Sequence, residues 1–392
     1  MNRHERGLAE IVGVAELPPE RDTGTQTDLS LAARVGHAAL RDAGLHPSVV
    51  DGLLTHPMEV ASRLVPSTIA EALGLRLSYA ESVDLGGATA VGMLTRASSM
   101  IAAGMASVCL CITTAPRSAS ASNAGQTRKT FDYSPAREFE VPYGNVGATE
   151  GYAMIAARYE HEFGDTSLAR AKLAVDQRHN AAGHPLAYFR DVPLTIDQVL
   201  ESEMIADPLR KLEMVLPTGG AAAVVVARRE QPRDGASPPV AILGSGEAIT
   251  HKSITYAPNL TSTAIADSAS MAFEAAGVPR ERIGLVSIYV CYTITALLTL
   301  EDAGFCAKGR AAQFICDRDL SWSGDFPVNT HGGQLSFGQA DVAGGMSHVT
   351  EAVLQLQRRA DGRQVNSLEY AFVNGNGGIM SEQTSVVLGL GG

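Results

Sequence analysis

The sequence of 392 residues lacks the features that mark several classes of protein. Its five cysteines show neither the spacing of a disulfide framework nor that of a zinc site. The longest apolar run, 221–227, is far shorter than the roughly 20 residues that cross a bilayer. The N-terminal residues contain no apolar core typical of a signal peptide. We therefore expect a cytoplasmic protein that has no membrane insertion and binds no metal of its own.

Charge limits the partners of the chain. The formal net charge is −11 and the isoelectric point is near 5.4, which argues against general binding of nucleic acid or of an anionic membrane. A local basic patch for a phosphorylated ligand stays open. Apolar residues make up 45% of the chain, as in globular proteins, and its length allows two domains with sizeable cores.

A distant internal repeat organises the sequence. A helical stretch that ends near Gly44 precedes a short apolar strand at 51–55, and a helical stretch that ends near Gly277 precedes another at 283–288. Glycine suits the left-handed residue that ends many helices. Each half then continues with a Gly-Gly turn, a helix with an apolar stripe and a second apolar strand. The order predicts an α/β protein with two similar, doubly wound halves.

Breaks in the repeat predict the domain boundaries. The turn-rich segment 232–239 (PRDGASPP) separates a first half, 1–235, from a second half, 236–392. Residues from about 115 to 215 have no counterpart in the second half and are rich in Tyr, Phe, Arg and His. We interpret them as an inserted loop domain that lines a site, or as an arm for dimer contacts.

Three segments carry a resemblance to a known family: SIYVCYTITALLTLEDAGFCAKG, FPVNTHGGQLSFGQADVAGG and FVNGNGGIMSEQ. With the repeat, they resemble the thiolase superfamily, in the branch of sterol-carrier-protein-type thiolases and bacterial lipid-transfer proteins. Within that branch the chain is most similar to steroid side-chain-cleaving aldolases that lack the catalytic cysteine. The resemblance implies a thiolase fold, a five-layered αβαβα arrangement with an inserted loop domain.

The positions that carry thiolase chemistry are altered. Aligned with the family, Gly87 stands where the nucleophilic cysteine belongs, Gln339 where a histidine belongs, and Asn374 where the acid/base cysteine belongs. Glycine cannot form an acyl-enzyme, so the chain is not expected to act as a thiolase. The backbone N–H groups of Gly87, Gly377 and Gly378 can still form an oxyanion site, or these glycines only permit tight turns.

Tyrosines are the candidates for proton transfer. Tyr289 and Tyr292 end an apolar strand of the second half, and the resemblance places an active-site aromatic residue at Tyr292. Either residue can instead be a buried ring with one hydrogen bond. Cys291, as a substitute nucleophile, is weighed against a packing role. Gln339 is a further catalytic candidate, which can hydrogen-bond a thioester oxygen but cannot shuttle a proton near neutral pH. Tyr256 and His331 are reserve candidates for proton transfer, and Tyr143 and Asn374 are candidates for substrate binding.

The family resemblance implies a carbon–carbon lyase. Its reaction is the retro-aldol cleavage of a bulky, steroid-like β-hydroxyacyl-CoA to a ketone and propionyl-CoA, which needs a base, an enolate site and an acid. No cofactor is expected, since CoA belongs to the substrate. Alternatives are acyl transfer without a cysteine, and a scaffold subunit that binds lipid-CoA.

The resemblance also implies partners. We expect a homodimer formed through the strand ASVCLCITT, and a heterotetramer with a partner that carries a zinc ribbon and an OB-fold. Candidates for contact with the CoA phosphates are Arg128, Lys129, Arg210 and Lys211.

Overall fold

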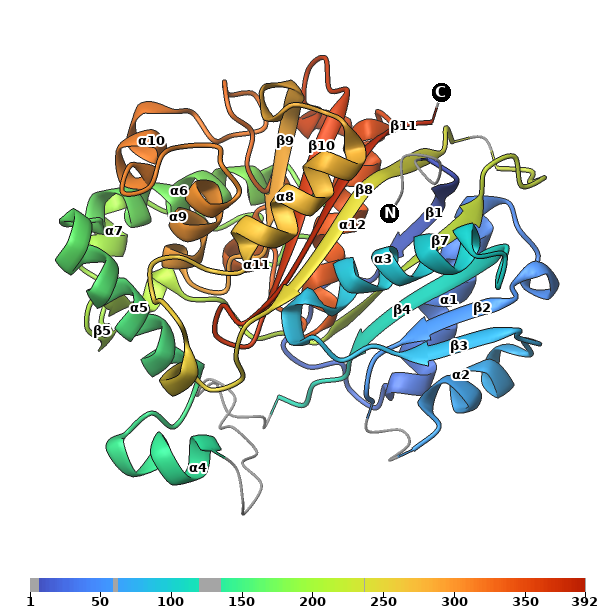
Figure 1. The fold of residues 1–392 in the computed structure, drawn as a ribbon, viewed down its shortest axis with the longest axis horizontal. Coiled ribbons are helices and arrows are strands. Elements are labelled where there is room, and N and C mark those ends of the chain that lie inside the picture. Colours follow the sequence, from blue (N-terminus) through green and yellow to red (C-terminus); the bar gives the residue numbers. More distant parts are fainter. Residues whose placement is uncertain (1–6, 59–62, 120–134, 236, 392) are drawn as a thin grey trace.

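The computed structural model describes residues 7–58, 63–119, 135–235 and 237–391. Within these ranges one sheet holds nine strands, drawn in Figure 1. The strands of this sheet are β1 (Ala9–Glu16), β2 (Gly52–Thr55), β3 (Tyr79–Ser82), β4 (Val108–Ala115), β7 (Gly220–Arg228), β8 (Val240–Ile249), β9 (Ile283–Ile288), β10 (Tyr370–Gly377) and β11 (Glu382–Leu390). A separate small hairpin consists of β5 (Met204–Ala206) and β6 (Leu209–Arg210).

Helices surround and separate these strands. In the first half and the insertion they are α1 (Asp28–Ala43), α2 (Val65–Leu73), α3 (Thr89–Ala102), α4 (Pro135–Phe139), α5 (Ala148–Phe163), α6 (Ser167–Ala182) and α7 (Ile196–Leu200). In the second half they are α8 (Ile265–Ala276), α9 (Thr293–Asp302), α10 (Ala311–Asp317), α11 (Gly333–Ser336) and α12 (Ala343–Leu356).

The strands fall into two sets with matching order. The first set runs β3-β2-β4-β7-β1 and the second runs β9-β10-β11-β8, and the sets join where β1 pairs with β8. Val328 makes an isolated parallel bridge to Val286 of β9, at the place that β3 holds beside β2. The internal repeat expected from the sequence is therefore present in the fold, and both sets mix parallel with antiparallel pairs.

The predicted helix ends are confirmed at both copies of the repeat. Gly44 and Gly277 cap α1 and α8 in the left-handed conformation, with φ of 67° and 59°. At its other end, Thr27 accepts a hydrogen bond from the backbone N–H of Ser30 and so begins α1. The predicted apolar stripes of both helices are buried. They consist of Leu31, Val35 and Ala39 in α1, and of Ile265, Ala269, Ala272 and Phe273 in α8.

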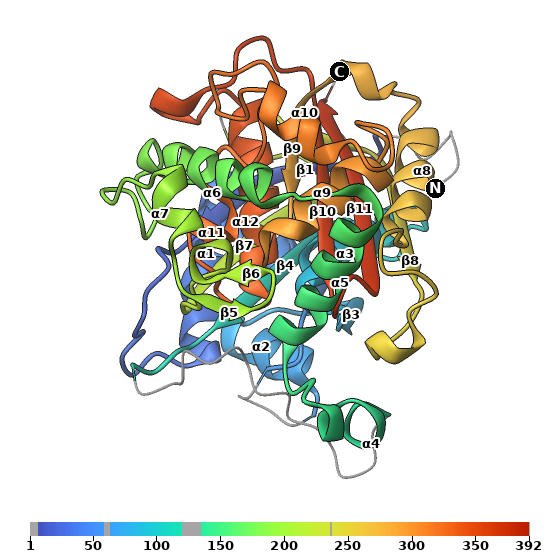
Figure 2. The same ribbon diagram turned by 90° about the vertical axis from the view of Figure 1, so that its left-hand side faces the viewer.

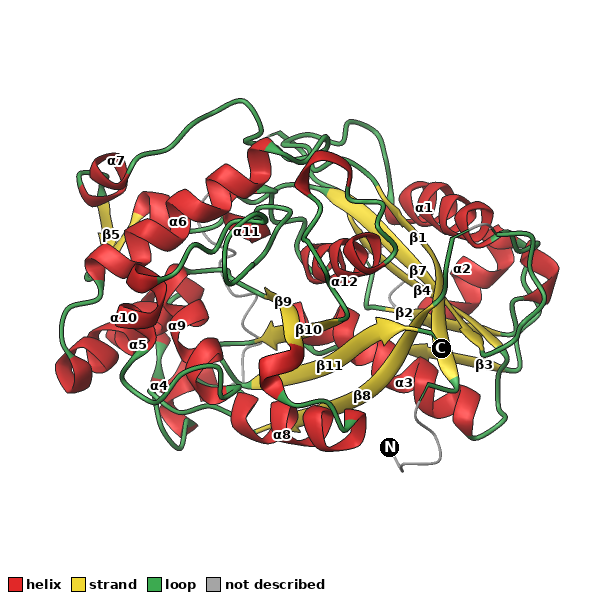
Figure 3. Cartoon of the chain, turned by 90° about the horizontal axis from the view of Figure 1, so that it is seen from above, coloured by secondary structure: helices red, strands yellow, loops and turns green. Residues whose placement is uncertain are grey.

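Five layers follow from how the helices pack. Figure 3 shows α1 and α2 outside the first set of strands and α8 outside the second set. Helices α3 and α12 lie between the sets, and each contacts strands of both. This is the αβαβα arrangement that the resemblance implied.

The insertion lies beside the second half. Figure 2 shows α5, α6 and α7 in front of the strands, and both α5 and α6 pack against α9. Residues 120–134 of the insertion lie outside the described residues. Because α5 also contributes to the cavity described below, at least this part of the insertion lines a site, the first of its two expected roles.

One expectation about assembly is wrong. The strand ASVCLCITT, which forms β4, lies inside the sheet, where β2 and β7 occupy both of its edges. Its apolar side chains are buried within the chain, so it offers no edge for a second copy. The free edge of the first set belongs to β3.

Among the described residues, no helix is both long enough and apolar enough to cross a membrane.

Candidate active site

A cavity of about 510 Å³ opens where the two halves and the insertion meet. Its lining includes the turn at Gly86–Gly87, residues at the ends of β2, β4 and β9, the turn after β10 and the N-terminal part of α5. The side chains that carry its chemistry belong to Asp28, His56, Thr114, Arg117, Tyr152, Lys252, Tyr289, Cys291, Tyr292, Gln339, Asp341 and Asn376.

The space that a thiolase nucleophile would need is taken by a phenol. A Cβ atom placed on Gly87 would lie 2.4 Å from Cζ of Tyr289 and 2.4 Å from the backbone oxygen of Asn376. Both distances are below any real contact of a Cβ atom. The ring of Tyr289 therefore occupies the space into which a side chain at position 87 would project. A phenol lies where the thiol of a thiolase nucleophile would be expected.

Gln339, which stands at the family's histidine position, holds that phenol. Its Nε2 donates hydrogen bonds to the Tyr289 hydroxyl and, at 2.9 Å, to the backbone oxygen of Asp341. The Tyr289 hydroxyl accepts this bond, so its own proton remains available for donation into the cavity. The backbone of Gln339 is fixed in turn, since its N–H donates to Leu216 and its oxygen accepts from Thr218.

Two further tyrosines of the cavity lining stack on each other. The rings of Tyr152 and Tyr292 lie 4.6 Å apart and 26° from parallel. The Tyr292 hydroxyl lies 2.8 Å from Oγ1 of Thr149, one turn before Tyr152 on α5. Stacking and the hydrogen bond together fix the phenol of Tyr292 against the insertion.

A chain of hydrogen bonds holds the glycine turn after β10. Gln383 Nε2 donates to Oδ1 of Asn376 at 2.8 Å, and Asn376 Nδ2 donates to the Tyr152 hydroxyl at 3.0 Å. That hydroxyl donates to the backbone oxygen of Gly378 at 3.0 Å. Gly378 adopts a φ of 59°, and its added Cβ would lie 2.0 Å from Oγ of Ser381, so the turn requires glycine.

Burial sets the protonation of the site. It raises the pKa of Tyr152, Tyr289 and Tyr292 above the usual value for tyrosine, so all three phenols are protonated and act as hydrogen-bond donors at neutral pH. It also raises the pKa of Cys291 to about 12, which leaves that residue as a thiol rather than a nucleophilic thiolate. Burial therefore disfavours a phenolate base and a substitute cysteine nucleophile.

The remaining predicted residues do not line the cavity. Asn374 is fully buried, and its Nδ2 donates to the Thr384 backbone oxygen at 3.1 Å, within the pair of β10 and β11. His331 is buried too, and burial lowers its pKa to about 4, so it is neutral. Tyr143 and Tyr256 are 86% and 59% exposed and do not line the cavity.

The three glycines of the expected oxyanion site are close in space but not equivalent. Gly87 and Gly378 line the cavity. Gly377 lies one residue before Gly378 in β10, and its added Cβ would lie 1.9 Å from the backbone oxygen of Leu85. Gly377 therefore allows β10 to approach the first glycine turn, whereas Gly87 and Gly378 are part of the cavity lining.

Cations at the cavity differ from those expected. Within the described residues, the basic side chains that line it are Arg117 and Lys252. Arg210 donates to the Ser202 backbone oxygen at 2.8 Å, and Lys211 pairs with Glu203 on the surface, so both lie outside the cavity. The other two candidates, Arg128 and Lys129, are outside the described residues.

Tyr152 is a residue that sequence reasoning missed, although a weak signal was present. Thr149 and Tyr152 are three residues apart on α5 and therefore share one face of that helix. An aromatic and a hydroxyl residue on one face of an insertion that covers a site are a plausible pair of lining residues. What no pattern in the sequence shows is that this face meets Tyr292.

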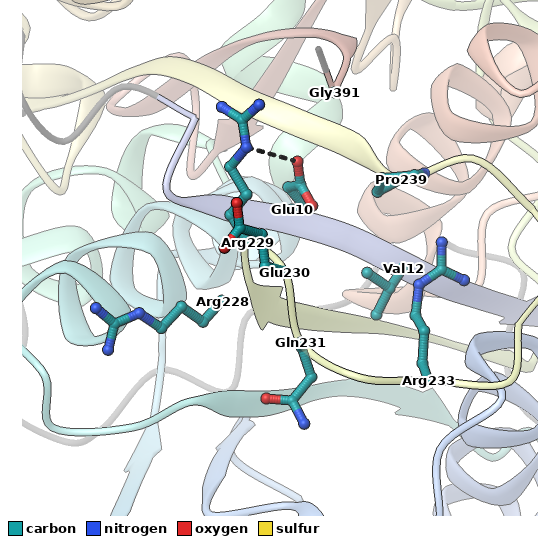
Figure 4. A pocket seen from close by; sticks show the side chains of 9 residues that line it. All are labelled: Glu10, Val12, Arg228, Arg229, Glu230, Gln231, Arg233, Pro239 and Gly391. Atoms are coloured by element: carbon teal, nitrogen blue, oxygen red, sulfur yellow. Dashed lines mark ion pairs between the residues drawn. The ribbon is translucent and has the colours of Figure 1, made fainter.

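A second hollow of about 280 Å³ lies at the far end of β1 and β7. Figure 4 shows that the side chains of Arg228, Arg229 and Arg233 point in different directions. Arg229 pairs with Glu10 at 4.0 Å, and Arg233 donates to backbone oxygens of its own loop. Its cations do not converge, so the larger cavity is the candidate active site.

Comparison with known proteins agrees with this geometry. The model of the thiolase C-terminal domain-like family matches residues 246–390. Over 357 residues the chain is 33% identical to the steroid side-chain-cleaving aldolase of Thermomonospora curvata, an alignment that covers 88% of this chain and 90% of the relative. It is also 33% identical to the 17-hydroxy-3-oxo-4-pregnene-20-carboxyl-CoA lyase of Mycobacterium tuberculosis, with 95% and 97% covered.

A solved structure gives the same answer. The Ltp2-ChsH2(DUF35) aldolase superposes on the chain with a TM-score of 0.88 and 30% identity, and 98% of each chain is covered. The fold, the altered nucleophile position and the named relatives agree with the resemblance found in the sequence. The chain belongs to the thiolase superfamily, in the family of steroid side-chain-cleaving aldolases.

Proposed function

We propose that the chain cleaves a bulky β-hydroxyacyl-CoA, with a 17-hydroxy steroid as the acyl part, to a 17-ketosteroid and propionyl-CoA. The single observation that carries the proposal is the ring of Tyr289 beside Gly87. A thioester site that has lost its nucleophile but keeps a protonated phenol is suited to enolate chemistry and not to acyl transfer. The named relatives support the same class of reaction.

The phenols supply hydrogen bonds and a proton in this scheme. Breaking the bond between Cα and Cβ leaves an electron pair on the thioester, as an enolate. Tyr289 and Tyr292 are buried and protonated, so either can donate a hydrogen bond to the enolate oxygen or a proton to Cα. Tyr152 acts on the site indirectly, because its hydroxyl holds Gly378 in place.

The backbone at Gly87 and Gly378 is the proposed oxyanion site. Both residues line the cavity from opposite halves of the chain. A side chain on either would collide with its surroundings, which keeps the backbone within reach of a ligand. Preorganised N–H groups that face a developing negative charge contribute roughly 3–4 kcal/mol each in comparable sites.

The proposal includes the rest of the substrate and the assembly. Arg117 and Lys252 are the basic residues placed to attract the CoA phosphates, and no separate cofactor is required. A homodimer and a partner with a zinc ribbon and an OB-fold remain proposals. The similar solved aldolase carries the names of two components, Ltp2 and ChsH2(DUF35), and this supports a partner for the present chain. We place the enzyme in the cytoplasm.

The test is incubation of the chain, with and without a zinc-ribbon and OB-fold partner, with the CoA ester of a 17-hydroxy steroid side chain. The expected products are 17-ketosteroid and propionyl-CoA in equal amounts. In Tyr292→Phe the ring stack is kept and the hydroxyl is lost, so turnover should fall at least tenfold. Tyr188→Phe, which removes a surface hydroxyl, is the matched control and should keep full turnover. Absence of both products in every arrangement refutes the proposal.

A further inference from the structure

Retro-aldol cleavage needs a base, and the phenols of the cavity are protonated. Burial keeps these phenols protonated at neutral pH, so another group has to remove the proton of the β-hydroxyl. Within the described residues, two carboxylates line the cavity, those of Asp28 and Asp341. Their surroundings differ, and the difference separates a structural carboxylate from a reactive one.

Asp28 is bound within the wall. It is buried at the first position of α1, and its Oδ1 accepts a hydrogen bond of 2.6 Å from the Thr114 hydroxyl. The same hydroxyl lies 3.3 Å from Nε2 of His56, which accepts the Thr114 backbone N–H at 3.0 Å. These contacts join the ends of β2 and β4 to the start of α1, so Asp28 stabilises the wall.

Asp341 is held at the site by its backbone while its carboxylate stays unengaged. Its φ is 44°, in the left-handed region that non-glycine residues rarely adopt. Its backbone oxygen accepts a hydrogen bond from Nε2 of Gln339, the amide that also donates to Tyr289. No other described residue donates a hydrogen bond to its carboxylate, and the side chain is exposed. One amide therefore fixes both Tyr289 and the residue that carries the free carboxylate.

Two titratable residues that also line the cavity, Tyr289 and His56, lie within reach of the charge of this carboxylate. Burial is the main cause of the raised pKa of Tyr289, and the negative charge of Asp341 adds to it. Burial lowers the pKa of His56 below the usual value, and the negative charge of Asp341 partly opposes this effect. The carboxylate thus lies close enough to both side chains to act on them, on the Tyr289 side of the cavity.

We propose that Asp341 is the general base that takes the proton of the substrate's β-hydroxyl, an inference that rests on the proposed function. The proton moves to the carboxylate as the Cβ–O bond becomes a carbonyl. The bond between Cα and Cβ breaks, and its electron pair passes to the thioester as an enolate. A phenol proton then adds to Cα, and the proton on Asp341 restores the phenol. The step is balanced and consumes no co-reactant.

The experiment compares Asp341→Asn with wild type in two assays. Asparagine keeps the size of the side chain and tolerates the left-handed conformation, but it cannot accept a proton at neutral pH. Cleavage of the 17-hydroxy steroid CoA ester should fall about 10²- to 10⁴-fold, the usual contribution of a general base. Binding of the analogous ester without the 17-hydroxyl, which cannot be cleaved, should change by less than about threefold. Asp341→Glu should recover at least about tenfold of the lost rate.

The matched control is Asp361→Asn. Asp361 is another exposed aspartate with a left-handed backbone, at a φ of 50°, and it does not line the cavity. This variant should cleave at the wild-type rate. Wild-type cleavage by Asp341→Asn overturns the inference, and so does a loss of cleavage matched by an equal loss of ester binding. Failure of the wild type itself to cleave the ester counts against the proposed function instead.

Discussion

A single methyl group at Gly87 should disrupt the site, because the space beside this residue is already occupied. The added Cβ of Gly87→Ala would meet Tyr289 Cζ and the Asn376 backbone oxygen, each at 2.4 Å. Ordinary contacts begin near 3.4 Å, so the ring and the strand β10 have to move apart by about 1 Å. The φ of Gly87 lies outside the left-handed region, so the cost comes from space and not from backbone conformation.

Overpacking of this size typically costs about 1–3 kcal/mol of stability. The displacement also moves the phenol that the proposed mechanism uses, and a shift of about 1 Å at a reacting group can lower turnover about a hundredfold. We therefore expect Gly87→Ala to lose both stability and cleavage. Gly362→Ala is the control, because its Cβ meets no atom within 4 Å and its φ is also ordinary. Its stability should stay within about 0.5 kcal/mol of wild type.

The assay is a double-mutant cycle in chemical denaturation with Gly87→Ala, Tyr289→Ala and the pair. Removing the ring removes one of the two collisions, so the methyl group should cost less in the Tyr289→Ala background. The expected coupling is at least about 0.5 kcal/mol. Strict additivity of the two changes, or wild-type stability of Gly87→Ala, would refute the steric reasoning.

Three further changes test other contacts. Tyr152→Phe keeps the stack on Tyr292 but releases the glycine turn after β10, so kcat should fall roughly tenfold or more; an unchanged kcat would contradict this positioning role. Burial raises the pKa of Glu16 from 4.5 to about 7. The contribution of this group to the free energy of unfolding is therefore complete below about pH 4.5 and is lost as the pH rises through about 7. Glu16→Gln should abolish that decline, of roughly 1–3 kcal/mol, in unfolding measured across this range; a decline that persists would assign it to another group. Arg363 and Glu351 form a buried ion pair at 2.8 Å; burial alone would raise the pKa of Glu351, but nearby positive groups, chiefly Arg363, lower it to about 2. Arg363→Met should lose about 3–5 kcal/mol and much of that should return in Arg363→Met/Glu351→Gln, whereas equal stability of all three proteins would contradict the prediction.

The internal repeat was predictable from the sequence because short stretches of neighbouring residues indicate it. Glycine caps, apolar stripes and Gly-Gly turns recur in both halves, and each is set by residues close together in the chain. The altered position Gly87 was found differently, because it followed from the resemblance to the thiolase superfamily and not from the local pattern of the turn. The structure adds what the turn alone does not reveal, which is the ring of Tyr289 in the space beside it.

Other parts of the site depend on which distant segments meet. The pairing of Tyr152 with Tyr292 joins the insertion to the second half, and no spacing within either segment encodes that contact. Tyr143 and Tyr256 were expected at the site because they are aromatic, but both side chains are exposed to solvent. The sequence does not show which aromatic residues are exposed. The strand β4 looked like an interface because it is apolar, but two neighbouring strands of its own sheet cover it.

The central claim is that this site performs carbon–carbon cleavage without an acyl-enzyme. Mass spectrometry of the intact protein, quenched during turnover of the 17-hydroxy steroid CoA ester, tests it most directly. The account predicts that propionyl-CoA accumulates while the mass of the chain stays unchanged. An acyl adduct that forms and decays at the rate of turnover, on Cys291 or on any other residue, would contradict it.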